Sequence, residues 1–285
     1  MNSLSVRLDQ TTPLSPLEFG LLGPLVVRSH SRLLDIGPPK RRVLLIRLLL
    51  ERRRAVPLES LVDDLWTSRP PPSAVSSVHA HISRLRSALE PGRVRRGTTS
   101  VLAREPMGYA LRVPAEAQDV FRFERKLGLA RRLLGEGRIR EARQEIDAAL
   151  ALWRGAPLAE AADHPFAAQE IARLEGARLL GHELRVTILI RGGSLEEAVL
   201  SAEELTFRTP LREVAWELLM HALYLSGRPA DALQQYAKLR GLLLEELGID
   251  PSPRLQQLQT AILRQDDTRL TALGVLAPSA SAVSR

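Results

Sequence analysis

The segment from Pro70 to Tyr109 constrains the fold more than any other part of this 285-residue chain. Apolar side chains recur there at helical spacing and predict an amphipathic helix over residues 73–89 that buries one stripe in its own domain. The stripe is formed by Val78, Ile82, Leu85 and Leu89. The opposite face has small, hydroxyl-bearing and basic side chains, with no carboxylate before Glu90. Such a face can approach another macromolecule closely.

The outer face of this helix suits the major groove of DNA. Hydroxyl, imidazole and guanidinium groups can reach base edges there, and small side chains allow the backbone to come close. We therefore expect base reading from Ser76, Ser77, His79, Ala80, Ser83 and Arg84. An ordinary solvated surface helix is the alternative interpretation of the helix taken alone.

The residues after the helix favour the first interpretation. A basic loop follows it, and residues 101–104 and 109–113 then predict two short strands with Met107-Gly108 at the bend. A groove-sized helix followed by a basic loop and a hairpin is typical of a winged helix-turn-helix. In that arrangement the wing contacts the neighbouring DNA backbone or minor groove.

The positive charge of the chain is concentrated in its first part. The whole chain has 40 basic and 33 acidic side chains, whereas residues 1–113 contain 18 basic and 9 acidic ones. All of the excess positive charge therefore lies in the first 113 residues, which indicates a polyanion as partner. A membrane surface would call for exposed aromatic or aliphatic side chains on a basic helix, and aromatic content is only 4%.

Phosphate contact is expected from basic residues that flank the helix. Three cations in the first turn of a helix predicted over residues 40–51 oppose the helix dipole, so an external anion would explain them. The basic loop and the wing supply the others. The assigned residues are Lys40, Arg41, Arg42, Arg86, Arg93, Arg95, Arg96 and Tyr109.

The first domain is predicted to span residues 18–113. Short strands over 19–22, 25–29 and 32–36 form a small antiparallel sheet, and a second helix covers 58–66 before the turn at 67–72. Residues 1–17 are expected to be disordered, and 114–118 to be a linker. Residues 1–113 alone should therefore fold and bind DNA.

The rest of the chain predicts an all-α domain over residues 119–266. Glycine followed five residues later by alanine occurs three times, starting at Gly137, Gly193 and Gly227. The last two glycines are 34 residues apart, the period of tetratricopeptide repeats, while an insertion over 153–165 would explain the longer first interval. Chance recurrence in an alanine-rich helical domain is the alternative. Residues 267–285 are expected to form a flexible tail.

Other classes of function find little support. The chain has no cysteine, which excludes disulfides and thiolate metal sites. His79 and His81 point about 200° apart on a helix and cannot share one ion. No catalytic constellation and no phosphate-binding loop stand out, so we expect no enzyme, no metal, no cofactor and no membrane segment.

Several motifs together carry a family resemblance. The sequence is similar to the Streptomyces antibiotic regulatory protein family over roughly residues 18–265. In the first half the matching stretches are Phe19 to Leu25, Gly37 to Arg42, Leu61 to Trp66, Val78 to Arg86 and Gly108 to Leu111. In the second half they are Ala149 to Gly155 and Glu246 to Pro253.

The resemblance implies a mainly α protein in which an OmpR-type winged-helix domain precedes a tetratricopeptide-like transcriptional activation domain. It implies a cytoplasmic, nucleoid-associated activator of antibiotic gene clusters. Such an activator binds direct repeats near the promoter −35 element and contacts RNA polymerase, with σ factor as the foremost target. We assign polymerase contact to Thr67, Ser68 and Arg69. We expect a free monomer that forms a side-by-side dimer on DNA.

A second class of function stays open. The chain could be a helical-repeat adaptor for other proteins, with a basic head that binds RNA or a membrane surface. Salt-dependent binding that prefers one duplex sequence over random duplex would separate the two hypotheses.

Overall fold

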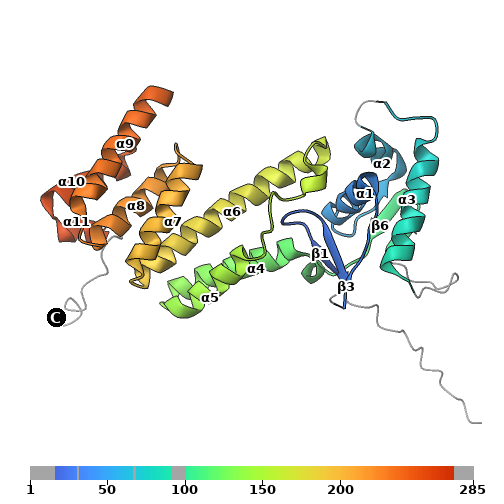
Figure 1. Ribbon diagram of the computed structural model, residues 1–285, viewed down its shortest axis with the longest axis horizontal. Coiled ribbons are helices and arrows are strands. Elements are labelled where there is room, and N and C mark those ends of the chain that lie inside the picture. The colour runs from blue at the N-terminus through green and yellow to red at the C-terminus, as the bar shows by residue number, and fades with distance from the viewer. Residues whose placement is uncertain (1–16, 31, 67–68, 92–100, 273–285) are drawn as a thin grey trace, which may run out of the picture. The chain divides into compact units, whose positions relative to one another are not determined.

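The computed structural model describes residues 17–30, 32–66, 69–91 and 101–272 (Figure 1). Disorder is predicted for residues 1–17: residues 1–16 lie outside the described residues, whereas Leu17 begins the first strand and corrects the prediction there. The chain divides into two compact units. The first unit comprises residues 1–123 and 152–175, and the second comprises residues 124–151 and 176–285.

The first unit begins with the predicted antiparallel sheet. Its strands are β1 (Leu17–Gly20), β2 (Val26–Ser29) and β3 (Arg32–Leu33), in the order β1-β2-β3. Phe19 pairs with Val27, and both side chains are buried. The strands are shorter than expected because the chain turns after Gly20, where Leu21 and Leu22 are buried.

Three helices follow as the apolar patterns predict. They are α1 (Pro39–Leu50), α2 (Leu58–Leu65) and α3 (Ala74–Leu89). In α3 the predicted stripe Val78, Ile82, Leu85 and Leu89 is buried, at most 5% exposed. This confirms which face of α3 the protein covers and which face it leaves outside.

The hairpin after α3 belongs to a three-stranded sheet. The predicted strands are present as β5 (Leu102–Glu105) and β6 (Gly108–Leu111). A third strand, β4 (Val56–Pro57), pairs with β6 and gives the order β4-β6-β5. Sequence reasoning missed β4 because two residues, one of them proline, carry no strand periodicity. A Cβ at Gly108 would lie 1.8 Å from the Val56 carbonyl oxygen, so only glycine allows this pairing.

Later parts of the chain complete the core of the first unit. The carboxylate of Asp119 accepts hydrogen bonds from the backbone N–H groups of Leu21 and Leu22, at 2.7 and 3.1 Å. Farther on, Arg154 N–H donates to the Leu22 carbonyl (2.7 Å) and Leu158 N–H to that of Leu21 (2.8 Å). These bonds tie the segments around residues 119 and 152–175 to the sheet.

The boundary at residues 114–118 therefore differs from the expectation of a linker. Residues Ala115–Ala117 form a short 3-10 helix, and Gln118 forms a parallel bridge to Phe19. Segment 152–175, expected in the second domain, lies in the first unit and contains the 3-10 helix Ala159–Ala161. Glu160 there accepts from Leu25 N–H at 2.9 Å.

The remainder of the chain is helical. The helices are α4 (Asp119–Gly135), α5 (Ile139–Leu150), α6 (Pro165–Arg191), α7 (Leu195–Arg208), α8 (Glu213–Leu225), α9 (Pro229–Leu247), α10 (Pro253–Arg264) and α11 (Asp267–Ala272). The chain passes from one unit to the other within α4, after α5 and within α6. The interval from Gly137 to Gly193 is therefore longer than one repeat because it contains both the 153–165 loop and the start of α6.

The glycine–alanine pattern marks the same turn three times. Gly137, Gly193 and Gly227 have φ angles of 74°, 75° and 74°, which glycine adopts without strain when it ends a helix. The alanines five residues later, Ala142, Ala198 and Ala232, are fully buried on the next helix. The three helical hairpins are α4–α5, α6–α7 and α8–α9. Trp216 also donates its indole N–H to the Pro210 carbonyl, 2.8 Å away.

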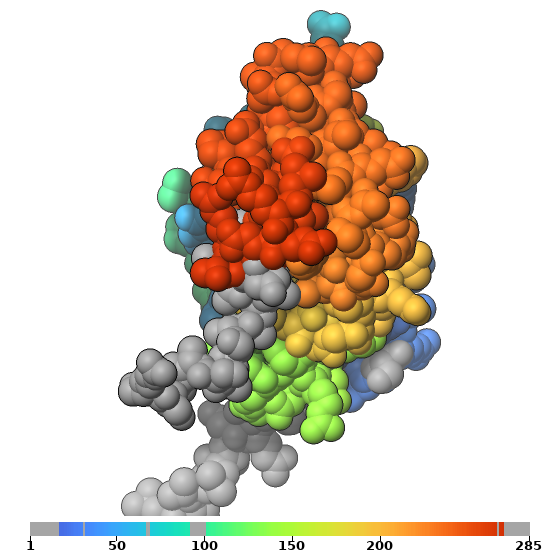
Figure 2. Space-filling model, turned by 90° about the vertical axis from the view of Figure 1, so that its left-hand side faces the viewer, coloured from blue at the N-terminus to red at the C-terminus, as the bar shows by residue number. Residues whose placement is uncertain are grey.

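The end of the described chain corrects the predicted flexible tail. Residues 267–272 form α11, which packs on α10, and Leu270 is fully buried in the core of the second unit. Figure 2 looks onto this end, where α10 and α11 are red and α8 and α9 orange. None of the helices in the described ranges has the length and apolar character needed to cross a membrane.

Candidate nucleic-acid interface

The outer face of α3 is open to solvent. Of the six side chains predicted to read bases, five are exposed and Ser77 is half-buried: Ser76, Ser77, His79, Ala80, Ser83 and Arg84. Ser76 donates its hydroxyl proton to the Ser73 carbonyl at 2.8 Å, so its oxygen remains available as an acceptor. Among the described residues, the Arg84 guanidinium has no hydrogen-bond or ion-pair partner. It can therefore bind an external acceptor without breaking an internal contact.

On the side of α3 that faces the wing, side chains of the helix pack against side chains of the wing. The Tyr109 ring lies edge-on to His79, with centroids 6.1 Å apart, and the Arg86 guanidinium lies 5.6 Å from the Tyr109 ring centre. Arg86 also donates from Nε to the Leu102 carbonyl at 2.9 Å. Tyr109 is only 6% exposed. The predicted phosphate contact of Tyr109 does not fit a buried ring, and Arg86 instead joins α3 to the wing.

The N-terminus of α1 lies on the other side of α3. The Lys40 ammonium lies 4.1 Å from the centre of the Trp66 ring, and Arg41 donates to the Ile36 carbonyl at 3.1 Å. Burial, followed by the positive charges of Arg41 and Lys40, lowers the pKa of His81 on α3. These two cations are therefore close enough to α3 to act on its side chains.

Arg42 differs from its two neighbours. Its guanidinium binds the Glu160 carboxylate, with Nε 2.8 Å from Oε1, and donates to the Leu25 carbonyl at 2.6 Å. Nε and Nη2 of the guanidinium are thus used inside the first unit. The predicted phosphate contact does not fit this geometry, and Arg42 connects α1 with segment 152–175.

The tip of the wing adds residues that sequence reasoning missed. Met107 is 74% exposed at the bend between β5 and β6, and Arg104 on β5 is also exposed. Arg112 is paired with Glu105 on the same hairpin. Alternation along the predicted strand, which places Ala103 and Arg104 on opposite faces, was the available signal for Arg104.

Some predicted residues lie outside the described part of the chain. These are Arg93, Arg95 and Arg96 in the basic loop and Thr67 and Ser68 in the turn before α3. Arg69, the third residue predicted to contact polymerase, is exposed. Within the described ranges, no three histidine or acidic side chains are grouped so that they could hold a metal ion.

The interface thus has a solvent-exposed helix face with cations on one side and a protruding hairpin on the other. Comparison with known families agrees with this arrangement. Residues 36–111 match the family described as "Transcriptional regulatory protein, C terminal", and residues 118–263 match "Bacterial transcriptional activator domain".

Similar proteins are known regulators. The chain is 34% identical to the regulatory protein DnrI of Streptomyces peucetius over 88% of this chain and 93% of that protein. It is 40% identical to the regulatory protein AfsR of Streptomyces coelicolor, over 94% of this chain and 26% of that protein. It is 36% identical to the transcriptional regulatory protein EmbR of Mycobacterium tuberculosis, over 87% of this chain and 64% of that protein.

A solved structure shares the fold. The Mycobacterium tuberculosis EmbR structure in complex with a low-affinity phosphopeptide superimposes with a TM-score of 0.82 at 34% identity, over 91% of this chain and 69% of that chain. The two family matches and the DnrI alignment span nearly all of the described residues. The chain therefore belongs to the Streptomyces antibiotic regulatory protein family of DNA-binding transcriptional regulators, in which an OmpR-type DNA-binding domain precedes a bacterial transcriptional activator domain.

Proposed function

We propose that this regulator activates transcription of a secondary-metabolite gene cluster by binding direct repeats near the promoter −35 element and recruiting RNA polymerase. The observation that carries the proposal is the outer face of α3, whose exposed side chains are small, hydroxyl-bearing or basic. The choice of an antibiotic cluster rests on the family resemblance. Action on chromosomal DNA would place the protein at the nucleoid.

The geometry supports insertion of α3 into the major groove. Arg84 has a guanidinium that can form two hydrogen bonds to guanine O6 and N7. Ser76, Ala80 and Ser83 let the helix come close to the base edges, while Lys40 and Arg41 reach toward a phosphate strand beside it. The proposed wing contact comes from Arg104 and Met107.

The readout can be tested by separating base contacts from phosphate contacts. A footprint of the full chain on promoters beside its gene defines the operator. Arg84→Ala should then lose roughly 1–3 kcal/mol on the operator while random duplex binding changes little. Lys40→Ala is the comparison, because a phosphate contact should weaken both duplexes alike and reduce the salt slope by about one unit. Equal loss on both duplexes for Arg84→Ala would make it a phosphate contact.

The binding mode is proposed to be tandem. Two repeats in one orientation require two copies docked head to tail, a contact that does not close into a symmetric dimer. We therefore infer a monomer in solution and two copies on the operator, spaced by about 10–10.5 base pairs. Five inserted base pairs would rotate one repeat to the far side of the duplex. Undiminished transcription after this insertion would contradict the tandem arrangement.

Polymerase contact is proposed for the turn before α3, which includes Thr67, Ser68 and the exposed Arg69. Arg69→Ala should reduce transcription in a purified system while leaving operator affinity unchanged. σ factor is the proposed target, so crosslinking from position 69 should label it on the promoter. An adaptor with an RNA- or membrane-binding head would instead bind RNA or anionic vesicles at least as tightly as the operator.

A further inference from the structure

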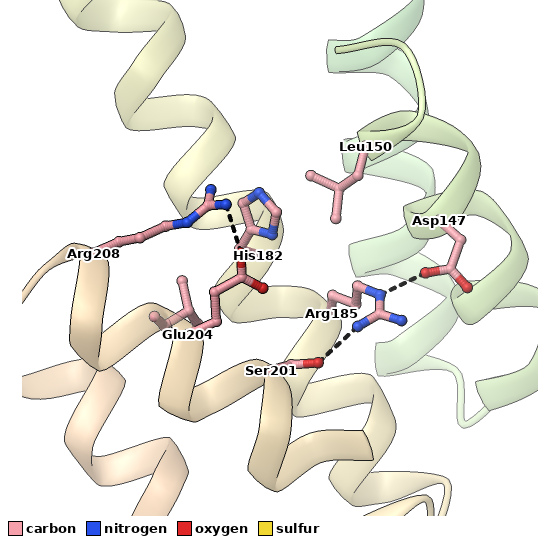
Figure 3. A pocket seen from close by; sticks show the side chains of 8 residues that line it. Asp147, Leu150, His182, Arg185, Ser201, Glu204 and Arg208 are labelled. Atoms are coloured by element: carbon pink, nitrogen blue, oxygen red, sulfur yellow. Dashed lines mark hydrogen bonds and ion pairs between the residues drawn. The ribbon is translucent and has the colours of Figure 1, made fainter. Parts of the chain in front are cut away.

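A cavity of about 260 Å³ lies in the second unit, between α5, α6 and α7 (Figure 3). Residues three or four positions apart share one face of a helix, so each helix contributes one row of side chains to its wall. The residues used below are Leu150 on α5, His182 and Arg185 on α6, and Ser201, Leu205 and Arg208 on α7. The wall is therefore apolar in part and charged in part, and Asp147 and Glu204 are its acidic groups.

One cation of the wall is fixed in place. Arg185 donates from Nε to Asp147 at 2.7 Å and from Nη1 to Ser201 at 2.9 Å, and it also pairs with Glu197. Since its guanidinium is engaged on every side, Arg185 holds the three helices together. Its charge is balanced by the carboxylates of Asp147 and Glu197, so its part in the cavity is structural.

His182, which lines the cavity, has one ring nitrogen without a partner in the described part of the chain. Its Nε2 is buried and has no hydrogen-bond partner among the described residues. A buried polar atom without a partner is destabilising and uncommon in folded proteins. Burial, then the charges of Arg178 and Arg208, lowers the pKa of His182, so the ring is neutral at neutral pH. A neutral imidazole can carry its one proton on Nε2 and donate it.

Arg208 lies at the rim and is weakly held. Its ion pair is with Glu204, and the two side chains are 52% and 59% exposed. Exposed pairs of this kind contribute little to stability, so Arg208 can turn toward an anion at low cost. Figure 3 shows its guanidinium beside the His182 ring, with Leu150 across the hollow.

We propose that this cavity binds a small organic acid. Its carboxylate accepts hydrogen bonds from His182 Nε2 and the Arg208 guanidinium, and its hydrocarbon part packs against Leu150 and Leu205. The apolar wall and the two available donors favour a carboxylate over inorganic phosphate, which needs more donors. A volume below the usual range of roughly 300–1,000 Å³ for drug-sized ligands favours a short acid. This inference does not depend on the proposed mode of DNA binding.

The test uses the full-length protein with carbon-13-labelled histidine. The chain has 6 histidines, and the loss of one signal in His182→Gln assigns the His182 resonance. Acetate, hexanoate and benzoate are titrated in, with hexanamide as the uncharged counterpart of hexanoate. We expect hexanoate or benzoate to shift the His182 signal saturably and to raise the pKa of the ring, because a carboxylate at Nε2 favours the imidazolium.

Arg208→Gln should weaken the binding of the best acid about tenfold, the loss of one charge-assisted contact. Arg228→Gln is the matched control, because Arg228 is also 52% exposed and pairs with a nearby acid, Asp231. It should leave binding unchanged. The proposal is overturned if none of the three acids shifts the His182 signal. It is equally overturned if hexanamide binds as tightly as hexanoate, or if the two arginine variants behave alike.

Discussion

Asp119 should hold the first unit together more strongly than any exposed carboxylate near it. Its side chain is only 4% exposed and accepts from two buried backbone N–H groups, those of Leu21 and Leu22. Asp119→Ala leaves both donors buried without an acceptor, at about 1–3 kcal/mol each. Arg154, its third partner at 3.1 Å, is 34% exposed and can bind water instead, so it adds little. We expect a loss of about 3–5 kcal/mol in the free energy of unfolding.

Urea unfolding followed by tryptophan fluorescence measures this loss. The chain has 3 tryptophans, and replacing Trp216 by phenylalanine leaves the two in the first unit as reporters. Glu18→Ala is the matched control, because Glu18 lies on β1, is 50% exposed and is 3.6 Å from Arg122. It should change stability by less than about 0.5 kcal/mol. An Asp119→Ala midpoint as close to wild type as that of Glu18→Ala would refute the reasoning.

Three further predictions concern a buried histidine, the close approach of the chain at a glycine, and the isolated fragment 1–113. Burial lowers the pKa of His221 to about 4, below the unfolded value, so the second unit should lose up to about 3 kcal/mol as the pH falls from 6.5 to 4. Urea midpoints against pH should show this loss in wild type but not in His221→Gln. Gly108→Ala should lower the free energy of unfolding of the first unit by at least about 1–3 kcal/mol, because the added methyl group clashes with Val56. Gly128→Ala is the control: the space around Gly128 is open, so alanine should stabilise α4 by up to about 1 kcal/mol. The sequence predicts that residues 1–113 fold alone, but the structure reverses this expectation, because the carboxylates that accept from the buried amide groups of Leu21, Leu22 and Leu25 lie outside that fragment. Circular dichroism of residues 1–113 should therefore show no cooperative thermal transition, and a transition matching that of the first unit in the full chain would contradict this.

Local patterns in the sequence determined much of the architecture. The stripe of Val78, Ile82, Leu85 and Leu89 was sufficient to predict both α3 and its outer face, because helical periodicity links spacing directly to burial. The sequence also predicts the three glycine–alanine turns, because a positive φ after a helix depends only on one residue and its neighbours. The hairpin after α3 and the sheet before α1 followed from short strand-like runs.

Only the tertiary structure decided which segments complete each unit. The pairing of β4 with β6, and the attachment of segment 152–175 to the first sheet, join residues far apart in sequence, and no periodicity records such partners. The same reason explains the misassigned side chains. Chemical type alone predicts surface positions for Arg42 and Tyr109, but a carboxylate more than a hundred positions away and a neighbouring helix determine where they lie. The cavity beside His182 also exists only because three helices meet there.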